Sequence, residues 1–452
     1  MALFKALRTR LCTTLQSPFD RQILAVAVPA FFALITEPLM LLADTAIIGH
    51  LGTPELGGLA AASVVLSTVV GLCVFLAYGS TASVARHHGA GDSRGAYALA
   101  ISSLWLATGL GILLGLLLAV SSGSLAQALS SSTPVAGFAR DYLLVSTLAI
   151  PAMLVILAAT GALRGSLDLR TPLHAMIVAN IANVVLNVLF VYGFDWGVRG
   201  AAAGTVVAQW WAAIWLATVI VRRSRQARAS TRPRIGEILD AARQGVPLLV
   251  RTATLRASII LGTLVAADLG DASLAAHQVA GTIVLFLAFA LDAIAIAGQT
   301  LTGHALGAGD ATTTRALTRR MIWWGLWTGL LAGAALAAVS PWVSHLFTTD
   351  PAVRDALVPA LVVVAAIQPL SGIVFVLDGV LIGAGDGVYL AVAGLFVLAA
   401  YAPLALAVGW THAGFTWLWV AYGGFIAARL ATLWHRQRGD AWMVLGATST
   451  SD

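Results

Sequence analysis

The chain has 452 residues, of which 59% are hydrophobic and only 10% are charged, against roughly 25% charged residues in a soluble domain. This composition excludes a water-soluble globular protein, because a soluble core cannot hide that much apolar surface. The net charge of +6 would suggest a nucleic-acid partner in a soluble protein. Here the basic residues gather in the segments between apolar runs, so we expect the lipid bilayer as a partner and no nucleic acid.

Apolar runs long enough to cross a bilayer recur along the whole chain. A helix needs about 20 apolar residues to cross the hydrocarbon, and runs of that length occur twelve times between breakers. The sequence therefore predicts an all-α polytopic membrane protein with twelve transmembrane helices. We expect them near residues 22–48, 59–84, 97–121, 141–163, 172–194, 200–221, 245–267, 276–302, 321–346, 356–382, 388–409 and 414–434.

The basic residues predict how these helices are oriented. If the N-terminus lies inside, most of the 26 Lys and Arg residues fall on the cytoplasmic side, including the cluster from Arg222 to Arg243 and Arg429 near the chain's end. Arg140, Arg199 and Arg354 fall on the opposite side. The positive-inside rule then places both termini in the cytoplasm. We expect a multi-pass protein of the inner (cytoplasmic) membrane, present as a monomer.

The two halves of the sequence resemble each other. Landmarks of the first half recur in the second at one constant offset without a gap, which is typical of an internal repeat. The matching pairs are Val28-Pro29 with Val246-Pro247, Leu51-Gly52 with Leu269-Gly270, the Gly-Ala-Gly-Asp runs 89–92 and 307–310, Pro151 with Pro369, and Gly161, Leu163, Gly165 and Asp168 with Gly379, Leu381, Gly383 and Asp386.

This repeat predicts the domain organisation. Each copy has six helices, so both enter the membrane in the same sense and form a parallel repeat. We expect an N-lobe at 1–221, a basic cytoplasmic linker at 222–244, a C-lobe at 245–436 and a cytoplasmic tail at 437–452. The Gly-Ala-Gly-Asp runs have neither a Walker lysine nor a preceding strand, so we interpret them as tight turns whose Asp caps the next helix.

Charged groups inside predicted spans are the first candidates for function, since each costs roughly 2.5–3.5 kcal/mol on insertion scales. The first span contains Glu37 and Asp44, which lie seven residues apart and so share a helix face. Pro38 lies between them and is expected to bend the helix. Two carboxyls on a bendable helix form a plausible site for protons or a cation. The alternative is a structural carboxylate bonded to a neighbouring helix.

The fifth and sixth spans offer polar partners for these acids. Asn180, Asn183 and Asn187 share one face of the fifth span, and Thr205 lies on the small-residue sixth. These side chains either join helices by hydrogen bonds or complete a cation-coupling shell around Asp44. If the cation were Na⁺, its ligands would be Asp44, Asn183 and Asn187, because hard cations take oxygen ligands.

The second half does not copy this arrangement, because Gly262 stands where the repeat would place Asp44. Its polar candidates include two cations and two anions. These either pair and neutralise one another or line a polar path for substrate. The candidates are Arg251, Arg256, Asp292, Gln299 and Asp378.

Two long segments carry a resemblance to a known family. The stretch from Glu37 through ADTAIIGHLGTPELGGLAAAS to ARHHGAGD, and its echo LAAHQVAGTIVLFLAFALDAIAIAGQTLTGHALGAGD, resemble the multidrug and toxin extrusion (MATE) transporters, most of all the DinF branch. The resemblance implies a V-shaped pair of six-helix lobes around a central cavity. It also implies export of small organic compounds, often cationic or amphiphilic, in exchange for H⁺ or Na⁺.

The resemblance implies coupling roles for Asp44, Asn183 and Asn187. Some relatives have an acid where this chain has Asn187, which leaves Asp44, with Glu37, as the titratable centre and favours H⁺ over Na⁺. Carboxylates that other branches carry in the C-lobe are absent, and Leu255 and Ser371 stand roughly there. We therefore expect multidrug efflux driven by protonation of an N-lobe carboxylate, with no cofactor and no catalytic residue.

Two alternatives remain at this point. The same fold could export a lipid-linked or other amphiphilic metabolite, with Arg251 and Arg256 meeting an anionic head group. A membrane enzyme is the third class, but the sequence shows no acid-rich metal cluster and no nucleophile with a base.

Overall fold

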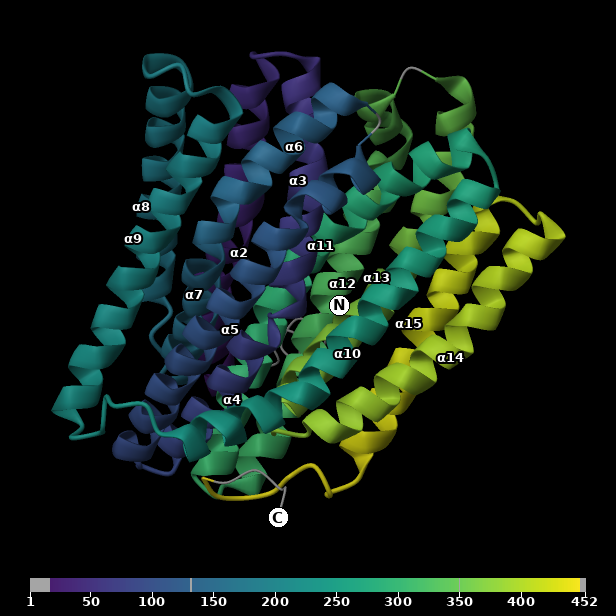
Figure 1. Cartoon of the computed structure of the whole chain (residues 1–452). Helices are drawn as coiled ribbons and strands as arrows, with labels where there is room; N and C mark the ends of the chain where they lie inside the picture. The colour runs from purple at the N-terminus through teal and green to yellow at the C-terminus, as the bar shows by residue number, and fades with distance from the viewer. Residues whose placement is uncertain (1–16, 131, 349, 448–452) are drawn as a thin grey trace, which may run out of the picture. The chain divides into compact units, whose positions relative to one another are not determined.

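The computed structural model describes residues 17–130, 132–348 and 350–447, apart from the side chains of Glu37 and Val343. These residues fold into helices joined by short turns, with no strand among them (Figure 1). The elements are α2 (Pro18–Gly49), α3 (Thr53–Leu72), α4 (Phe75–Gly89), α5 (Ser93–Leu129), α6 (Thr133–Ser146), the 3₁₀ turn η1 (Thr147–Ala149), α7 (Ile150–Gly165), α8 (Arg170–Val188), the π-helical turn η2 (Leu189–Gly193), α9 (Gly197–Gln226), α10 (Ile235–Asp268), α11 (Asp271–Gly307), α12 (Ala311–Phe347), α13 (Pro351–Gly383), α14 (Gly387–Thr411) and α15 (Phe415–Arg438).

The all-α polytopic fold is confirmed. Within the described residues, 11 helical segments are long and apolar enough to cross a membrane, and α15 supplies the position of the twelfth predicted span. Most helices run several residues beyond the predicted ends, because the predictions followed apolar runs and the helices continue into polar turns. The predicted linker 222–244 is largely helical, since α9 continues to Gln226 and α10 begins at Ile235.

Two spans of the first half are interrupted where we expected continuous helices. The second span breaks at Cys73–Val74, between α3 and α4, and the fourth tightens into η1 before Pro151. Pro151 has no N–H to donate to Thr147, so the helix loses a hydrogen bond at that turn. In the second half, α13 continues through Pro369 and α11 has no break.

The repeat appears as equivalent close contacts between helices. In the first half, Gly161 and Gly165 of α7 lie against the backbone of α4, where any Cβ would collide with the carbonyl oxygens of Ala77 and Thr81. In the second half, α13 meets α11 in the same way, with Gly379 against Ala295 and Gly383 against Gln299. Glycine four residues apart lets two membrane helices approach to backbone contact.

The two Gly-Ala-Gly-Asp turns cap helices, as predicted. Asp92 accepts a hydrogen bond from the Gly95 amide (2.8 Å) at the start of α5, and Asp310 accepts one from the Thr313 amide (2.9 Å) at the start of α12. Hydrogen bonds from the Thr312 and Thr313 hydroxyls lower the pKa of Asp310 to about 2. The cap of α12 therefore keeps its negative charge, which suits a helix N-terminus, at any physiological pH.

The described residues separate into two compact units. One, here called the N-unit, is Phe32–Thr252, and the C-unit contains the rest. The segment after α9 belongs to the N-unit, where the Ser102 hydroxyl donates to Glu237 (2.9 Å) and the Trp105 indole donates to the Thr231 carbonyl (3.3 Å). These hydrogen bonds attach the basic segment between α9 and α10 to α5, so the segment packs against the N-unit.

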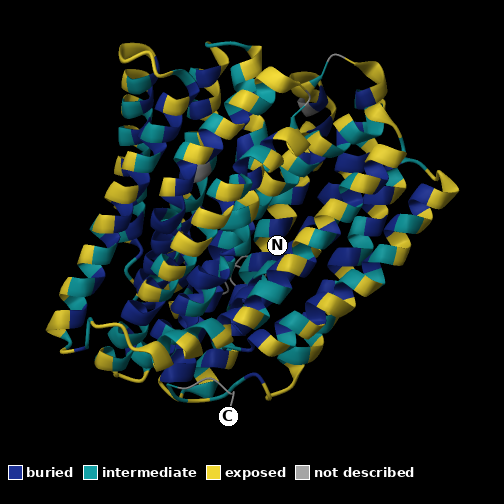
Figure 2. Ribbon diagram, in the orientation of Figure 1, coloured by how far each residue is buried: buried dark blue, intermediate teal, exposed yellow. Residues whose placement is uncertain are grey.

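Exposed residues recur along most helices (Figure 2), and many of them are large and apolar. On α5, Leu116 and Val120 are 63% and 89% exposed, while small residues such as Gly111 and Gly115 face neighbouring helices. Water would disfavour this arrangement and lipid favours it, since lipid tails are as apolar as leucine. The chain is a multi-pass membrane protein.

Candidate functional site

The candidate coupling site lies in the N-unit around Asp44. Asp44 projects from α2 and is 3% exposed, and the side chains of Asn183 and Asn187 on α8 are fully buried. The Asn187 amide nitrogen donates to Asp44 Oδ1 at 2.6 Å, and it also lies 3.4 Å from Asn183 Oδ1. The Asn183 amide donates to the Thr205 hydroxyl of α9 at 2.9 Å. The structure thus brings together four of the predicted residues.

No basic side chain in the described part of the chain pairs with Asp44. The carboxyl group of Asp44 is buried, and its hydrogen-bond donor is the Asn187 amide. A buried carboxylate without a cation or several donors is unfavourable in its charged form. Uptake of a single proton by the Asp44 carboxyl group would therefore convert the site from a charged state to a neutral one.

Two residues of this site escaped the sequence analysis. Tyr142, on α6, is buried next to Thr205 and Ser146 and within electrostatic range of Asp44. Gly204 of α9 leaves space for Asn187, because a Cβ there would collide with the Asn187 amide oxygen. The small residues of the sixth span suggested close packing, but only the fold shows which side chain fills the gap.

Asn180 lies on the same face of α8 but acts on the helix backbone. Its amide nitrogen donates to the Thr36 carbonyl of α2 at 2.6 Å. Pro38 has no N–H to donate to the carbonyl of Leu34, four residues earlier, so the bond from Asn180 lies within the turn that Pro38 weakens. The helix α2 continues unbroken through Pro38, and the predicted bend there stays a prediction. The Glu37 side chain lies outside the described part of the structure.

In the C-unit, Asp378 of α13 pairs with Arg429 of α15 at 3.2 Å. We had assigned Arg429 to the cytoplasmic side by its position in the sequence. Its side chain is buried between Asp378 and the rings of Phe375 and Phe425, and its side of the membrane stays a prediction. A buried guanidinium needs such partners, and neither partner was visible from charge counting.

The other C-lobe candidates differ in how far they are buried. Arg251 is buried with its guanidinium over the ring of Tyr78, 5.7 Å from the centroid, and Arg256 is exposed on α10. Asp292 is half-buried on α11, and Gln299 is buried where α11 meets α13. No cluster of three His, Cys, Asp or Glu suited to a metal ion occurs among the described side chains.

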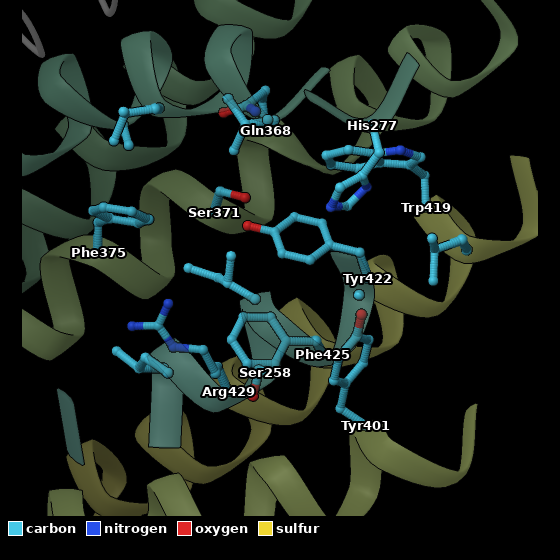
Figure 3. Close-up of a pocket in the computed structure, with 18 of the residues that line it drawn as sticks. Ser258, His277, Gln368, Ser371, Phe375, Tyr401, Trp419, Tyr422, Phe425 and Arg429 are labelled. Carbon is cyan, nitrogen blue, oxygen red and sulfur yellow. The ribbon is translucent and has the colours of Figure 1, made fainter. Parts of the chain in front are cut away.

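The C-unit also contains a cavity of about 270 Å³, whose wall includes several rings beside aliphatic side chains (Figure 3). Helices α10, α11, α13, α14 and α15 contribute to it. On α15, the residues Trp419, Tyr422, Phe425 and Arg429 share one face at helical spacing. This spacing is the sequence signal that could have indicated the cavity.

A duplicated helical membrane fold, with a buried acid in one half and an aromatic cavity in the other, is the build of a transporter. The MatE family model matches the chain twice, at residues 29–189 and 247–408. The chain belongs to this family of multidrug and toxin extrusion (MATE) transporters, as its sequence suggested.

The relatives agree with this assignment. The chain is 30% identical to DNA damage-inducible protein F of Escherichia coli over 457 residues, which cover 97% of each chain. It is also 30% identical to the chloroplastic protein DETOXIFICATION 44 of Arabidopsis thaliana over 410 residues, 86% of this chain and 78% of the relative. A solved MOP superfamily transporter from Pyrococcus furiosus shares the fold, with a TM-score of 0.85 at 22% identity over 95% of this chain and 98% of that one.

Proposed function

We propose that this MATE transporter is an antiporter of the inner membrane that exports organic cationic or amphiphilic compounds in exchange for H⁺. Protonation of Asp44 drives the exchange. The observation that carries the proposal is the burial of Asp44 with one amide donor and no basic partner in the described residues. Membership in the family and the toxin-related name of its Arabidopsis relative support the cargo class.

The geometry favours a proton over Na⁺ as the coupling ion. A sodium ion would need several oxygen ligands directed at one point. Here the Asn187 nitrogen faces Asp44, and the Asn183 nitrogen faces Thr205. A carboxyl with one N–H donor can release and regain a proton, whereas a sodium site would require both amides to present their oxygens.

Protonation of Asp44 would act on α2. Loss of the charge weakens the bond from Asn187, since a hydrogen bond to an ionised acceptor is roughly twice as strong as a neutral one. The same helix contains Pro38, where a backbone hydrogen bond is missing and where Asn180 supports the Thr36 carbonyl. A bend at Pro38 would thus couple the protonation state to the helix. Each pKa unit of difference between inward- and outward-facing states supplies about 1.4 kcal/mol of bias.

The test is dye export by the purified protein in liposomes with an imposed pH gradient. We expect Asp44→Asn to lose gradient-driven transport at least tenfold, because the amide cannot exchange a proton. Asp195→Asn is the matched control, since Asp195 is exposed in the turn after η2 at φ 56°, a conformation that Asn adopts readily. If Asp44→Asn transports as well as Asp195→Asn, the mechanism is wrong. Replacing the pH gradient by a Na⁺ gradient tests the choice of ion.

A lipid-linked or other amphiphilic metabolite is the alternative cargo. The exposure of Arg256 on α10 is the observation in its favour, since a guanidinium at the middle of a span can meet an anionic head group. Arg256→Gln should then impair growth of a strain that depends on this transporter under cell-wall stress. Under the antiporter proposal the same variant leaves cationic dye export nearly unchanged.

A further inference from the structure

The aromatic cavity of the C-unit occupies the place that the coupling site has in the N-unit. Gly262, which the repeat sets against Asp44, lines it. A Cβ at Gly262 would come within 3.0 Å of the Tyr401 hydroxyl, and the same offset sets Tyr401 against Asn183. The duplicated fold has thus exchanged an acid and an amide for a glycine and an aromatic ring at the edge of a cavity.

Several flat rings form part of the wall of this cavity, beside aliphatic side chains. His277 lies 5.5 Å from Trp419 between ring centroids, Tyr422 stacks on Phe425 at 5.5 Å, and Tyr401 meets Phe425 edge-on at 5.5 Å. In Figure 3 the Tyr422 ring lies among the other lining side chains, with its hydroxyl directed toward Ser371. The ring faces and edges that border the cavity suit a planar aromatic ligand, which stacks offset or edge-to-face with them.

Buried polar atoms in the walls have no partner among the described residues. They are the Trp419 indole nitrogen and the Gln368 amide oxygen, on side chains only 4% exposed, and His277 Nδ1. Most buried polar atoms in proteins form hydrogen bonds, so a donor and an acceptor left over in one cavity indicate a ligand that supplies their partners.

The charges around the cavity select against cations. Arg429 lines it, whereas its partner Asp378 does not, and no carboxylate is among the described lining residues. Of the two charged groups in this ion pair, the Arg429 guanidinium is therefore the one that lines the cavity. A guanidinium offers five N–H donors in a planar fork that matches a carboxylate.

We propose that this cavity is a binding site for a planar aromatic compound that carries a carboxylate. The ligand ring packs against the cluster of Tyr422, Phe425 and Trp419, and the acid faces Arg429. This inference goes beyond the proposed antiport, whose coupling residues lie in the N-unit. Binding to the cavity can be measured without an ion gradient. It assigns to the C-unit an acidic ligand class, unlike the organic cations expected as exported compounds.

The test compares three probes of one shape on the purified full chain in detergent, by isothermal titration calorimetry. They are 2-naphthoate, the neutral 2-naphthamide and the cationic 2-naphthylmethylammonium. We expect naphthoate to bind at least tenfold more tightly than the amide, and the ammonium probe to bind most weakly. Equal binding of all three, binding of none, or tightest binding of the ammonium probe overturns the proposal without any variant.

Variants then locate the site. The double substitution Arg429→Gln with Asp378→Asn removes both charges together and leaves no buried charge alone. It should reduce the preference for naphthoate over naphthamide to within about twofold. A preference that survives in the folded double variant places the acid elsewhere.

A second pair of variants tests the ring contacts. Trp419→Phe removes the indole donor and part of the ring face, and should weaken naphthoate binding about fivefold or more. Trp410→Phe is the matched control, because Trp410 is 77% exposed on α14 and away from the cavity. Equal losses in the two variants would contradict the assignment of the cavity. Because no gradient is applied, failure here leaves the antiport proposal untouched, and loss of transport in Asp44→Asn leaves this one untouched.

Discussion

Asn187 reaches Asp44 because position 204 carries no side chain. Helix α9 runs next to α8, and a Cβ at 204 would meet the Asn187 amide oxygen and lie 3.1 Å from its backbone nitrogen. The backbone at Gly204 cannot move easily away from α8, because the hydroxyl of the next residue, Thr205, accepts a hydrogen bond from Asn183 of α8. Gly204 is thus a positioning residue for the coupling site.

We expect Gly204→Ala to displace the Asn187 side chain and destabilise the protein by about 1–3 kcal/mol, the usual cost of overpacking. Thermal unfolding in detergent measures the stability, and pH-driven dye export measures the coupling. Gly79→Ala is the matched control, because Gly79 lies within α4 with nothing within 4 Å of an added Cβ. That control should be neutral or slightly stabilising. Equal melting temperatures for the two variants would contradict this role of Gly204.

Single residues also show how far the sequence predicts the site. Asp44, Asn183, Asn187 and Thr205 were predicted because polar groups are rare in spans and because the two asparagines share one face of their helix. Tyr142 was not predicted, because an isolated tyrosine in an apolar run has no periodic signal. Its approach to Thr205 depends on how α6 meets α9, and that packing is a tertiary property.

At the scale of elements, the turns after α7 and α13 are copies with one difference. Leu167 has φ 61°, whereas the equivalent Gly385 has φ 75°. Both turns make the same hydrogen bonds, with Leu167 donating to the Arg164 carbonyl and Gly385 to that of Ile382, each at 2.9 Å. Leucine in the left-handed region costs roughly 1–2 kcal/mol, so the first turn is strained and the second is not.

Leu167→Gly should therefore stabilise the protein by about 0.5–1 kcal/mol, after allowance for the greater freedom of glycine in the unfolded chain. Gly385→Leu should have the opposite sign and a magnitude of about 1–2 kcal/mol. Both are read as shifts in melting temperature of the purified protein. Shifts of the same sign would show that the turn conformations do not control stability.

Hydrogen bonds hold the aspartate at the first of these turns. Asp168 caps α8 by accepting from the Thr171 amide at 3.0 Å, and it also accepts from Arg223 of α9. Partial burial alone would raise the pKa of Asp168, but the bonds from Thr171 and Arg223 lower it below its ordinary value. Arg223 belongs to the segment that we had predicted as a linker. Its bond to Asp168 is one reason why α9 extends to Gln226, and no local pattern could have indicated it.

At the scale of the whole molecule, the repeat is conservative in its packing and divergent in its chemistry. The prolines, the close glycine contacts and the capping aspartates recur in both halves, because each fixes where two helices approach or where one begins. The buried polar groups do not recur, since Asp44 corresponds to Gly262 and Asn183 to Tyr401. The duplicated landmarks made the architecture predictable. The cavity was not, because its aromatic residues were interpreted only as apolar membrane sequence.

The orientation of the whole chain is still a prediction from its basic residues, and it can be tested with single cysteines. After Cys12 and Cys73 are replaced by serine, Arg228→Cys lies in the turn between α9 and α10, and Asp195→Cys lies in the turn between α8 and α9. The positive-inside rule places Arg228 in the cytoplasm and Asp195 outside. A membrane-impermeant maleimide added to spheroplasts should label Asp195→Cys within minutes and label Arg228→Cys only after lysis. The reverse pattern would invert the topology, and labelling of both in intact spheroplasts would mean that the helix between them does not cross the membrane.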